Sequence, residues 1–276
     1  MSAVRSPTPF LDLNGVLAEL VRSQRRVLGA SFVGTYLQGS FAVGDSDEHS
    51  DVDFVVATEN ELADPQVQAL QAVHGRIFDL ESEWARHLEG SYFPRPVLRS
   101  CSRRGEQLWY LDNGSRSLVR SDHCNTAVVR STVRERGVCL AGPAPTELVD
   151  AVPVEVLREE ILSVVIDWGR KILSAPDEYR NRFYQGFIVL SYCRMLRDLR
   201  VGSVGSKRTG AEWTKENLDP AWAGLIDRAW LTRPNPAVSV RQAPDPEDFA
   251  RTLDFVRHAI AMAMPLADSP ANPGTA

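Results

Sequence analysis

The sequence has few of the features that mark secreted and membrane-spanning proteins. Its 276 residues include four cysteines, scattered and without a C-x-x-C pair or zinc-ligand spacing. No apolar run approaches the roughly 20 residues of a membrane-spanning helix, and the N-terminal residues lack the apolar core of a signal peptide. We therefore expect reduced thiols and a cytoplasmic protein.

A basic excess is also missing. The chain has 31 Lys and Arg against 36 Asp and Glu, a formal net charge of −5 at pH 7. This balance argues against a broad nucleic-acid-binding surface, which needs clustered positive charge, but it leaves room for a small basic pocket. The hydrophobic content of 43% is sufficient for a sizeable core.

Apolar periodicity divides the chain into two parts. The first part alternates helical patterns, at residues 10–28, 64–78 and 125–136, with strand-like runs at residues 31–37, 52–56, 86–93, 108–111 and 137–143. The second part has only helical patterns, at residues 154–173, 182–199, 211–216, 220–230 and 246–264. The sequence predicts an α+β fold class, with an N-terminal domain at residues 1–152, a C-terminal all-α helical bundle at 153–266 and a disordered tail at 267–276.

One stretch, G-S-F-A-V-G-D-S-D-E-H-S-D-V-D-F-V-V at residues 39–56, suggests chemistry. Alternate residues of a strand face the same side, so Asp51 and Asp53 point the same way. Adjacent carboxylates repel unless a cation lies between them, and Mg²⁺ takes one or two carboxylates together with phosphate oxygens. Gly39 lets the backbone approach a bound group, and Ser40 offers a hydroxyl and an N–H to a phosphate. The stretch predicts a nucleotide–Mg²⁺ site, although Asp-x-Asp alone usually marks a solvated strand end.

The order of these features resembles the signature of the nucleotidyltransferase superfamily related to DNA polymerase β. The resemblance implies that a hydroxyl attacks the α-phosphorus of a nucleoside triphosphate while metal ions offset the growing charge. A general base helps to remove the hydroxyl proton. A third carboxylate on a neighbouring strand can be the base, a metal ligand or both. Glu89 is the candidate, although its local sequence by itself favours a solvated strand-end glutamate.

Residues 36–231 resemble the aminoglycoside adenylyltransferases that modify streptomycin and spectinomycin. The motif at residues 39–53 matches that family, and Glu89 falls where the family has its catalytic base. Residues 134–143 and 147–153 are similar to the family's helix-to-strand stretch and the segment that follows it. The resemblance implies a mixed-sheet nucleotidyltransferase domain followed by a helical domain.

The helical domain of that family brings an arginine and a lysine to the triphosphate and an aromatic side chain to the adenine. Arg194, Lys207 and Trp230 match these positions, and Ser50 matches a serine that contacts phosphate. Arginine can make a forked contact to phosphate oxygens and lysine supplies a point charge. From the residues alone they could equally be a surface arginine, a loop lysine and a core tryptophan.

One region departs from the family, which places acidic residues, an aromatic and a histidine where it holds the cationic drug. When the chain is aligned with the family without gaps back from Arg194, Arg180 and Tyr184 occupy the acidic positions. Phe187 occupies the histidine position. Asp177 and Glu178 lie nearby but out of register. Carboxylates that face a polycationic drug stabilise its binding. Because the aligned positions are not acidic here, the identity of the acceptor is left open.

The sequence predicts an enzyme that transfers AMP from ATP to a hydroxyl of a small molecule, with an aminoglycoside-type antibiotic favoured. Asp51, Asp53 and Glu89 are the predicted catalytic residues and Mg²⁺ ligands. We expect a monomer without a membrane partner. The alternatives are adenylylation of a protein or RNA and a nucleotide-binding regulator without catalysis. The acidic composition disfavours RNA, and the intact carboxylate trio disfavours the regulator.

Overall fold

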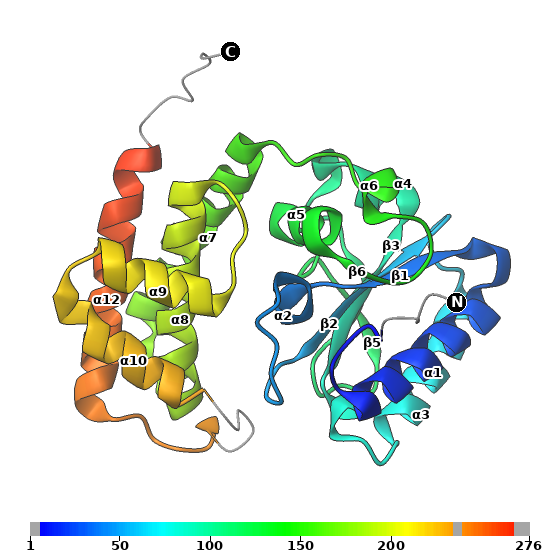
Figure 1. The fold of residues 1–276 in the computed structure, drawn as a ribbon, viewed down its shortest axis with the longest axis horizontal. Coiled ribbons are helices and arrows are strands. Elements are labelled where there is room, and N and C mark those ends of the chain that lie inside the picture. Colours follow the sequence, from blue (N-terminus) through cyan, green and yellow to red (C-terminus); the bar gives the residue numbers. More distant parts are fainter. Residues whose placement is uncertain (1–5, 234–238, 268–276) are drawn as a thin grey trace. The chain divides into compact units, whose positions relative to one another are not determined.

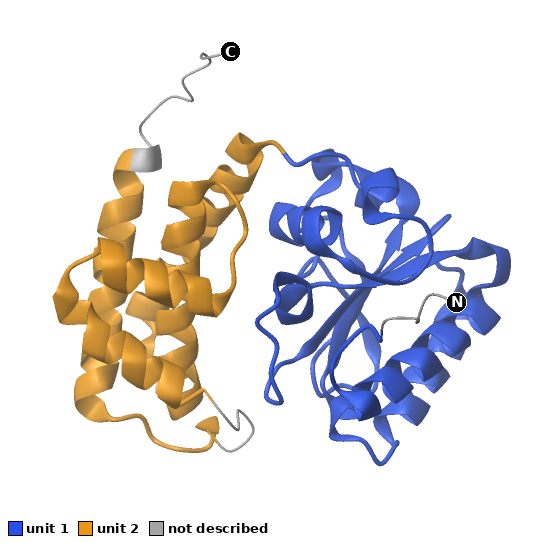
Figure 2. Ribbon diagram, viewed as in Figure 1, with its two compact units in different colours: residues 1–152 blue, residues 153–276 orange. Residues whose placement is uncertain are grey.

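The structure is a computed structural model that describes residues 6–233 and 239–267. The chain divides into two compact units, residues 1–152 and 153–276 (Figure 2). Unit 1 combines a sheet with helices, and the described part of unit 2 is helical. The predicted α+β fold class is confirmed. Of the predicted disordered tail, Ala267 is the last residue of helix α12, and residues 268–276 lie outside the described residues.

Unit 1 contains, in chain order, α1 (Leu11–Leu28), β1 (Phe32–Leu37), α2 (Gly39–Val43), β2 (Val52–Thr58), α3 (Asp64–Phe78), β3 (Leu88–Pro94), α4 (Arg95–Arg99), β4 (Leu108–Leu111), β5 (Leu118–Ser121), α5 (Ala127–Arg136), β6 (Val138–Ala141) and α6 (Pro145–Leu148). Unit 2 contains α7 (Val154–Ser174), α8 (Arg182–Val201), α9 (Lys207–Asn217), α10 (Ala223–Leu231) and α12 (Pro246–Ala267). Short 3₁₀ turns connect several of these elements, at Gly29–Ser31, Glu83–Arg86, Cys101–Arg103, Pro176–Tyr179 and Pro220–Trp222.

The sheet of unit 1 is mixed, with the strand order β5-β4-β3-β2-β1-β6 (Figure 1). β2 and β3 run parallel, and the remaining neighbours are antiparallel. The crossover from β2 to β3 is made by α3 and a short turn. The N-terminal ends of β2 and β3 therefore lie next to each other.

Side chains of β2 alternate between two buried clusters. Val52, Phe54 and Val56 pack into the cluster formed with α1 and α3. Val55 and Ala57 pack into the cluster formed with α4, α5 and α6. Figure 1 shows the two helix groups on opposite faces of the sheet. Because side chains alternate along a strand, odd-numbered residues of β2 face the layer of α4, α5 and α6.

Unit 2 is arranged around α8. This helix contacts α7, α9, α10 and α12, and most of its side chains are buried. Among the described residues, no helix is both long and apolar enough to span a membrane.

Candidate active site

The predicted carboxylates lie at the beginning of two neighbouring strands. Asp53 and Glu89 are partners in the parallel pairing of β2 with β3, and paired strands lie about 4.8 Å apart. Val52 and Leu88, which directly precede these two carboxylates, point into the cluster under α1 and α3. The side chains of Asp53 and Glu89 therefore face the other side of the sheet. Asp51 alternates onto the same side as Asp53. The structure thus brings the three carboxylates to one region of one sheet face.

Gly39 packs directly against the Asp53 carboxylate. Its φ of 58° lies in the left-handed region, and a Cβ at this position would be 1.9 Å from Asp53 Oδ2, so glycine is required. The backbone N–H of Gln38 donates to the Asp53 carbonyl at 2.9 Å, and Gln38 Oε1 accepts from the Gly39 N–H at 2.8 Å. The Gly-Ser pair is the start of the five-residue helix α2, not merely a turn between two strands. Asp53 is therefore fixed by close backbone contact.

The two predicted phosphate serines differ in their surroundings. Ser40 Oγ is shielded from solvent and makes no hydrogen bond within the described residues. Buried hydroxyls usually have a partner, and a phosphate oxygen would supply one. Ser50 is 8% exposed, and its Oγ accepts from the Asp47 N–H at 2.9 Å and donates to Asp47 Oδ1 at 3.3 Å. Ser50 thus closes the loop before β2, and its contact with phosphate stays a prediction.

Glu89 is held by two residues that the sequence analysis did not identify. The Tyr110 hydroxyl donates to Glu89 Oε1 at 2.8 Å, and His123 Nε2 lies 3.4 Å from the same oxygen. Burial, and then the neighbouring Glu89 charge, raise the pKa of Tyr110 well above its usual range, so the phenol keeps its proton. The hydrogen bond to Glu89 raises the pKa of the His123 imidazole.

The segment that follows β4 reaches a second carboxylate. Asn113 Nδ2 donates to Asp51 Oδ1 at 2.6 Å, and the Tyr110 hydroxyl also lies 2.9 Å from Asp112 Oδ1. The sequence predicts a strand at residues 108–111 and a turn after it. Its local pattern contains no signal that this strand pairs with β3, and that pairing is what makes these contacts.

The predicted metal ligands are all carboxylates, which suits Mg²⁺. Within residues 6–233 and 239–267, no three His, Cys, Asp or Glu side chains form a ready-made metal site. Glu89 Oε1 and Asp51 Oδ1 instead accept hydrogen bonds. Mg²⁺ commonly uses one or two carboxylates together with phosphate oxygens and water, so Asp51 and Asp53 with a nucleotide fit the ion. The role of Glu89 as a ligand stays a prediction.

In unit 2, Arg194 and Lys207 lie on two helices in close contact. A Cβ at Gly210 of α9 would be 2.5 Å from Arg194 Cα of α8, so a glycine lets the two backbones approach. Lys207 is the first residue of α9, and its Nζ lies 4.5 Å from the centre of the Phe187 ring of α8. Phe187 and Arg194 are seven residues apart and share one side of α8.

The loop that precedes Lys207 is anchored on the buried Asp198. Asp198 Oδ1 accepts from the Gly205 N–H and from Arg197 Nη1, each at 2.9 Å. Arg197 Nη1 also donates to the Ser203 carbonyl at 2.7 Å. Burial raises the pKa of Asp198. These bonds fix the start of α9 and with it the backbone of Lys207.

Trp230 is half-buried on α10, and cations already cover its ring. The guanidinium carbons of Arg208 and Arg233 lie 5.1 and 4.6 Å from the ring centre. The indole also lines a cavity of about 340 Å³ with side chains of α9 and α10. The contact of Trp230 with adenine stays a prediction.

Comparisons with known proteins find similar sequences and a similar fold. A sequence model of the C-terminal domain of aminoglycoside adenylyltransferases matches residues 147–254. An aminoglycoside (3'') (9) adenylyltransferase of Shigella flexneri is 26% identical over 224 residues, covering 78% of this chain and 83% of the relative. This chain is similar to the aminoglycoside adenylyltransferases over most of its length. The predicted resemblance is therefore confirmed, as is the prediction of a nucleotidyltransferase enzyme.

Two further adenylyltransferases are similar to this chain in sequence or in structure. A spectinomycin 9-adenylyltransferase of Staphylococcus aureus is 27% identical over 221 residues, covering 74% of this chain and 78% of the relative. The crystal structure of a spectinomycin adenyltransferase from Enterococcus faecialis with ATP and spectinomycin has a TM-score of 0.66 at 14% identity. The match covers 90% of this chain and 98% of that chain, which shows a shared fold.

The chain has aromatic and basic side chains at the positions where its sequence departs from these adenylyltransferases. Tyr184 contacts the ring of Phe187, with 6.4 Å between their centres. Arg180 Nε donates to Asp177 Oδ1 at 2.8 Å, so one of the two acidic residues near the departing positions is already paired with a cation. The guanidinium of Arg180 also lies 5.1 Å from the centre of the Phe249 ring.

Proposed function

We propose that this chain is a Mg²⁺-dependent enzyme that transfers AMP from ATP to a hydroxyl of a small-molecule antibiotic of the aminoglycoside class. The observation that carries the proposal is the in-register pairing of Asp53 with Glu89, with Gly39 packed against Asp53. Two carboxylates on adjacent strands can serve different purposes, one as a metal ligand and one as a base. The names of the relatives supply the adenylyl group and the acceptor class, and ATP is bound in the similar spectinomycin adenyltransferase structure.

The residues of unit 1 would bind the reacting groups. Asp51 and Asp53 would hold Mg²⁺, and the ion would supply positive charge to offset the charge that develops on the phosphate oxygens. Ser40 Oγ donates to a phosphate oxygen. Glu89 accepts the proton of the acceptor hydroxyl. The hydroxyl oxygen then bonds to the α-phosphorus, the bond between that phosphorus and the bridging oxygen breaks, and pyrophosphate leaves.

Two cations of unit 2 would bind the triphosphate. Arg194 can make two parallel hydrogen bonds to phosphate oxygens, and Lys207 adds a single point charge. The anchored loop before α9 holds the Lys207 backbone in place. Trp230 would contact the adenine if the guanidinium groups over its ring moved aside.

The test is pyrophosphate release from Mg-ATP with streptomycin, spectinomycin, other aminoglycosides and lincosamides. We expect release with at least one acceptor, and a loss of at least about 100-fold in kcat for Glu89→Gln, in the range found for general bases. Asp53→Asn should reduce release similarly, because the metal loses a ligand. The control is Glu83→Gln, an exposed glutamate that pairs with Arg86, for which we expect no change. Undiminished transfer by Asp53→Asn at saturating Mg-ATP would contradict the proposal.

A further inference from the structure

Two residues at the end of β4 and in the turn after it contact two of the three predicted carboxylates. Tyr110 donates to Glu89 Oε1 at 2.8 Å, and Asn113 donates to Asp51 Oδ1 at 2.6 Å. We propose that the segment Tyr110–Asn113 is a positioning element, in which Tyr110 orients Glu89 as the base and Asn113 orients Asp51 as the metal ligand. The inference rests on the proposed function.

The contact of Tyr110 leaves Glu89 able to act. Tyr110 and His123 both use Oε1, and within the described residues no donor is assigned to Oε2. One oxygen is thus anchored while the other can accept a proton from the acceptor hydroxyl. Anchoring restricts the glutamate to few rotamers, and restricted catalytic groups react faster than mobile ones.

Strand pairing explains why these two residues reach the carboxylates. In the antiparallel pairing of β3 with β4, Gly90 is opposite Leu111 and Ser91 is opposite Tyr110. Continuing this register places Glu89 opposite the residue after Leu111, so Tyr110 is its diagonal neighbour on the same face. Tyr110 is 5% exposed and belongs to the cluster under α4, α5 and α6. Its ring is therefore held by packing while its hydroxyl faces the site.

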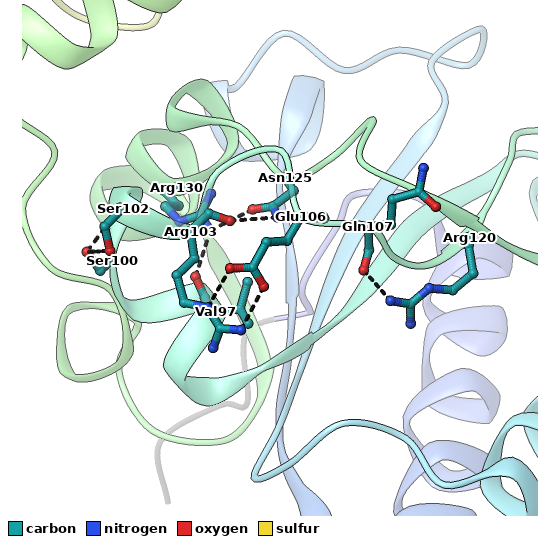
Figure 3. A network of polar contacts seen from close by, with 9 residues as sticks. All are labelled: Val97, Ser100, Ser102, Arg103, Glu106, Gln107, Arg120, Asn125 and Arg130. Atoms are coloured by element: carbon teal, nitrogen blue, oxygen red, sulfur yellow. Dashed lines mark hydrogen bonds and ion pairs between the residues drawn. The ribbon is translucent and has the colours of Figure 1, made fainter.

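β4 is itself held at its beginning by the polar network of Figure 3. Fully buried Arg130 of α5 donates from Nη2 to Asn125 Oδ1 at 2.6 Å. Asn125 Nδ2 donates to the Glu106 carbonyl at 2.7 Å, and Arg120 Nη2 donates to the Gln107 carbonyl at 2.6 Å. Glu106 and Gln107 directly precede β4. The strand that carries the tyrosine is thus anchored to α5 and β5, as a positioning element requires.

Asn113 orients Asp51 in the way that Tyr110 orients Glu89. Its amide N–H can fix one oxygen of Asp51 while the carboxylate keeps further lone pairs for a cation. Partners that hydrogen-bond to metal ligands typically contribute about 10- to 100-fold in metal affinity or activity. We therefore expect the two residues to differ in what they affect, with Asn113 changing Mg-ATP binding and Tyr110 changing turnover.

The test compares Tyr110→Phe with Tyr36→Phe. Tyr36 belongs to the same buried cluster and its hydroxyl donates to the Pro143 carbonyl at 2.8 Å, so Tyr36→Phe removes an equivalent buried hydroxyl bond outside the site. Tyr110→Phe should lower kcat about 10- to 100-fold with the KM for ATP within about twofold. Tyr36→Phe should leave kcat unchanged. In a Glu89→Gln background, Tyr110→Phe should cause no further loss. Equal losses in the two tyrosine variants, or a further loss in that background, would overturn the role of Tyr110.

Asn113→Ala should weaken Mg-ATP binding about 10-fold by calorimetry, while Asn60→Ala, at an exposed position, should not. Unchanged binding by Asn113→Ala would overturn the role of Asn113. Crystal structures of the wild type and Tyr110→Phe give a readout that needs no activity. We expect the Glu89 carboxylate to take another rotamer in the variant, and an unmoved carboxylate would overturn the inference. A wild type that transfers AMP to no acceptor would instead contradict the proposed function, and the structures and binding data would still decide the inference.

Discussion

At the scale of single residues, Gly39 is a position where a side chain would disturb a predicted metal ligand. Its φ of 58° disfavours any side chain, and a Cβ would overlap Asp53 Oδ2. In Gly39→Ala we expect the Asp53 carboxylate to be displaced, Mg-ATP binding to weaken at least about 10-fold, and stability to fall by about 1–3 kcal/mol from backbone strain. Calorimetric titration with Mg-ATP and thermal unfolding measure the two effects separately.

Gly44 provides the matched control for this prediction. It ends α2 with a φ of 79°, and a Cβ there would meet no atom within 4 Å. Gly44→Ala therefore introduces similar backbone strain without contact with Asp53. We expect a similar loss of stability and unchanged Mg-ATP binding. An equal loss of binding in both variants would show that strain in α2, rather than the overlap with Asp53, is responsible.

The same residues show which parts of the site could be predicted from sequence. Asp51 and Asp53 could be placed on one face because strand alternation is a local property. Tyr110 and Asn113 could not be linked to the carboxylates, since their contacts depend on the pairing of β3 with β4. Local sequence does not encode which strands become neighbours.

At the scale of elements, one buried polar network connects α1 and α3 with the sheet. Tyr92 of β3 bonds to His74 Nε2 of α3 at 2.8 Å, and Thr35 of β1 donates to Gln24 Oε1 of α1 at 2.7 Å. His74 is 2% exposed, and burial lowers its pKa from 6.5 to about 4. The imidazole must therefore be neutral in the folded protein, while the unfolded chain takes up a proton below pH 6.5.

This difference predicts an acid-sensitive packing of α3 on the sheet. The pKa of His74 is lower in the folded protein than in the unfolded chain. The free energy of unfolding is therefore highest above pH 6.5 and decreases as the pH falls towards 4. The total decrease in the free energy of unfolding is about 3 kcal/mol, because each unit of pKa difference corresponds to about 1.4 kcal/mol. Urea unfolding between pH 7 and 4 measures it. In His74→Gln this part of the pH dependence should disappear, and in His87→Gln it should remain. An identical pH dependence in wild type and His74→Gln would contradict the prediction.

The elements themselves were predicted to different degrees. α3 has the predicted range, because proline near its start and helical apolar spacing both mark it. α9 starts at Lys207, four residues before the predicted position, because Ser206 caps it by accepting from the Thr209 N–H. β5 was not predicted. It has four residues, is largely exposed and pairs only with β4, so its apolar pattern is too short to detect.

At the scale of the whole molecule, the proposed function requires residues of both units to contribute to the affinity for one nucleotide. Asp51 and Asp53 belong to unit 1, whereas Arg194 and Lys207 belong to unit 2. A charge-assisted hydrogen bond to phosphate contributes about 1.5–3 kcal/mol. Arg194→Ala and Lys207→Ala in the full chain should each weaken Mg-ATP binding at least about 10-fold, and the difference from wild type should shrink as salt is raised.

Lys171→Ala is the control for the charge itself, since this exposed lysine lies in the last turn of α7. It removes one positive charge from unit 2, and we expect the same Mg-ATP affinity as in the wild type. Calorimetric titrations at two salt concentrations distinguish the cases. A general field effect would weaken binding in all three variants, whereas direct phosphate contacts weaken it only in Arg194→Ala and Lys207→Ala. Unchanged affinity in both of these would restrict nucleotide binding to unit 1 and would leave the acceptor as the ligand of the helical unit.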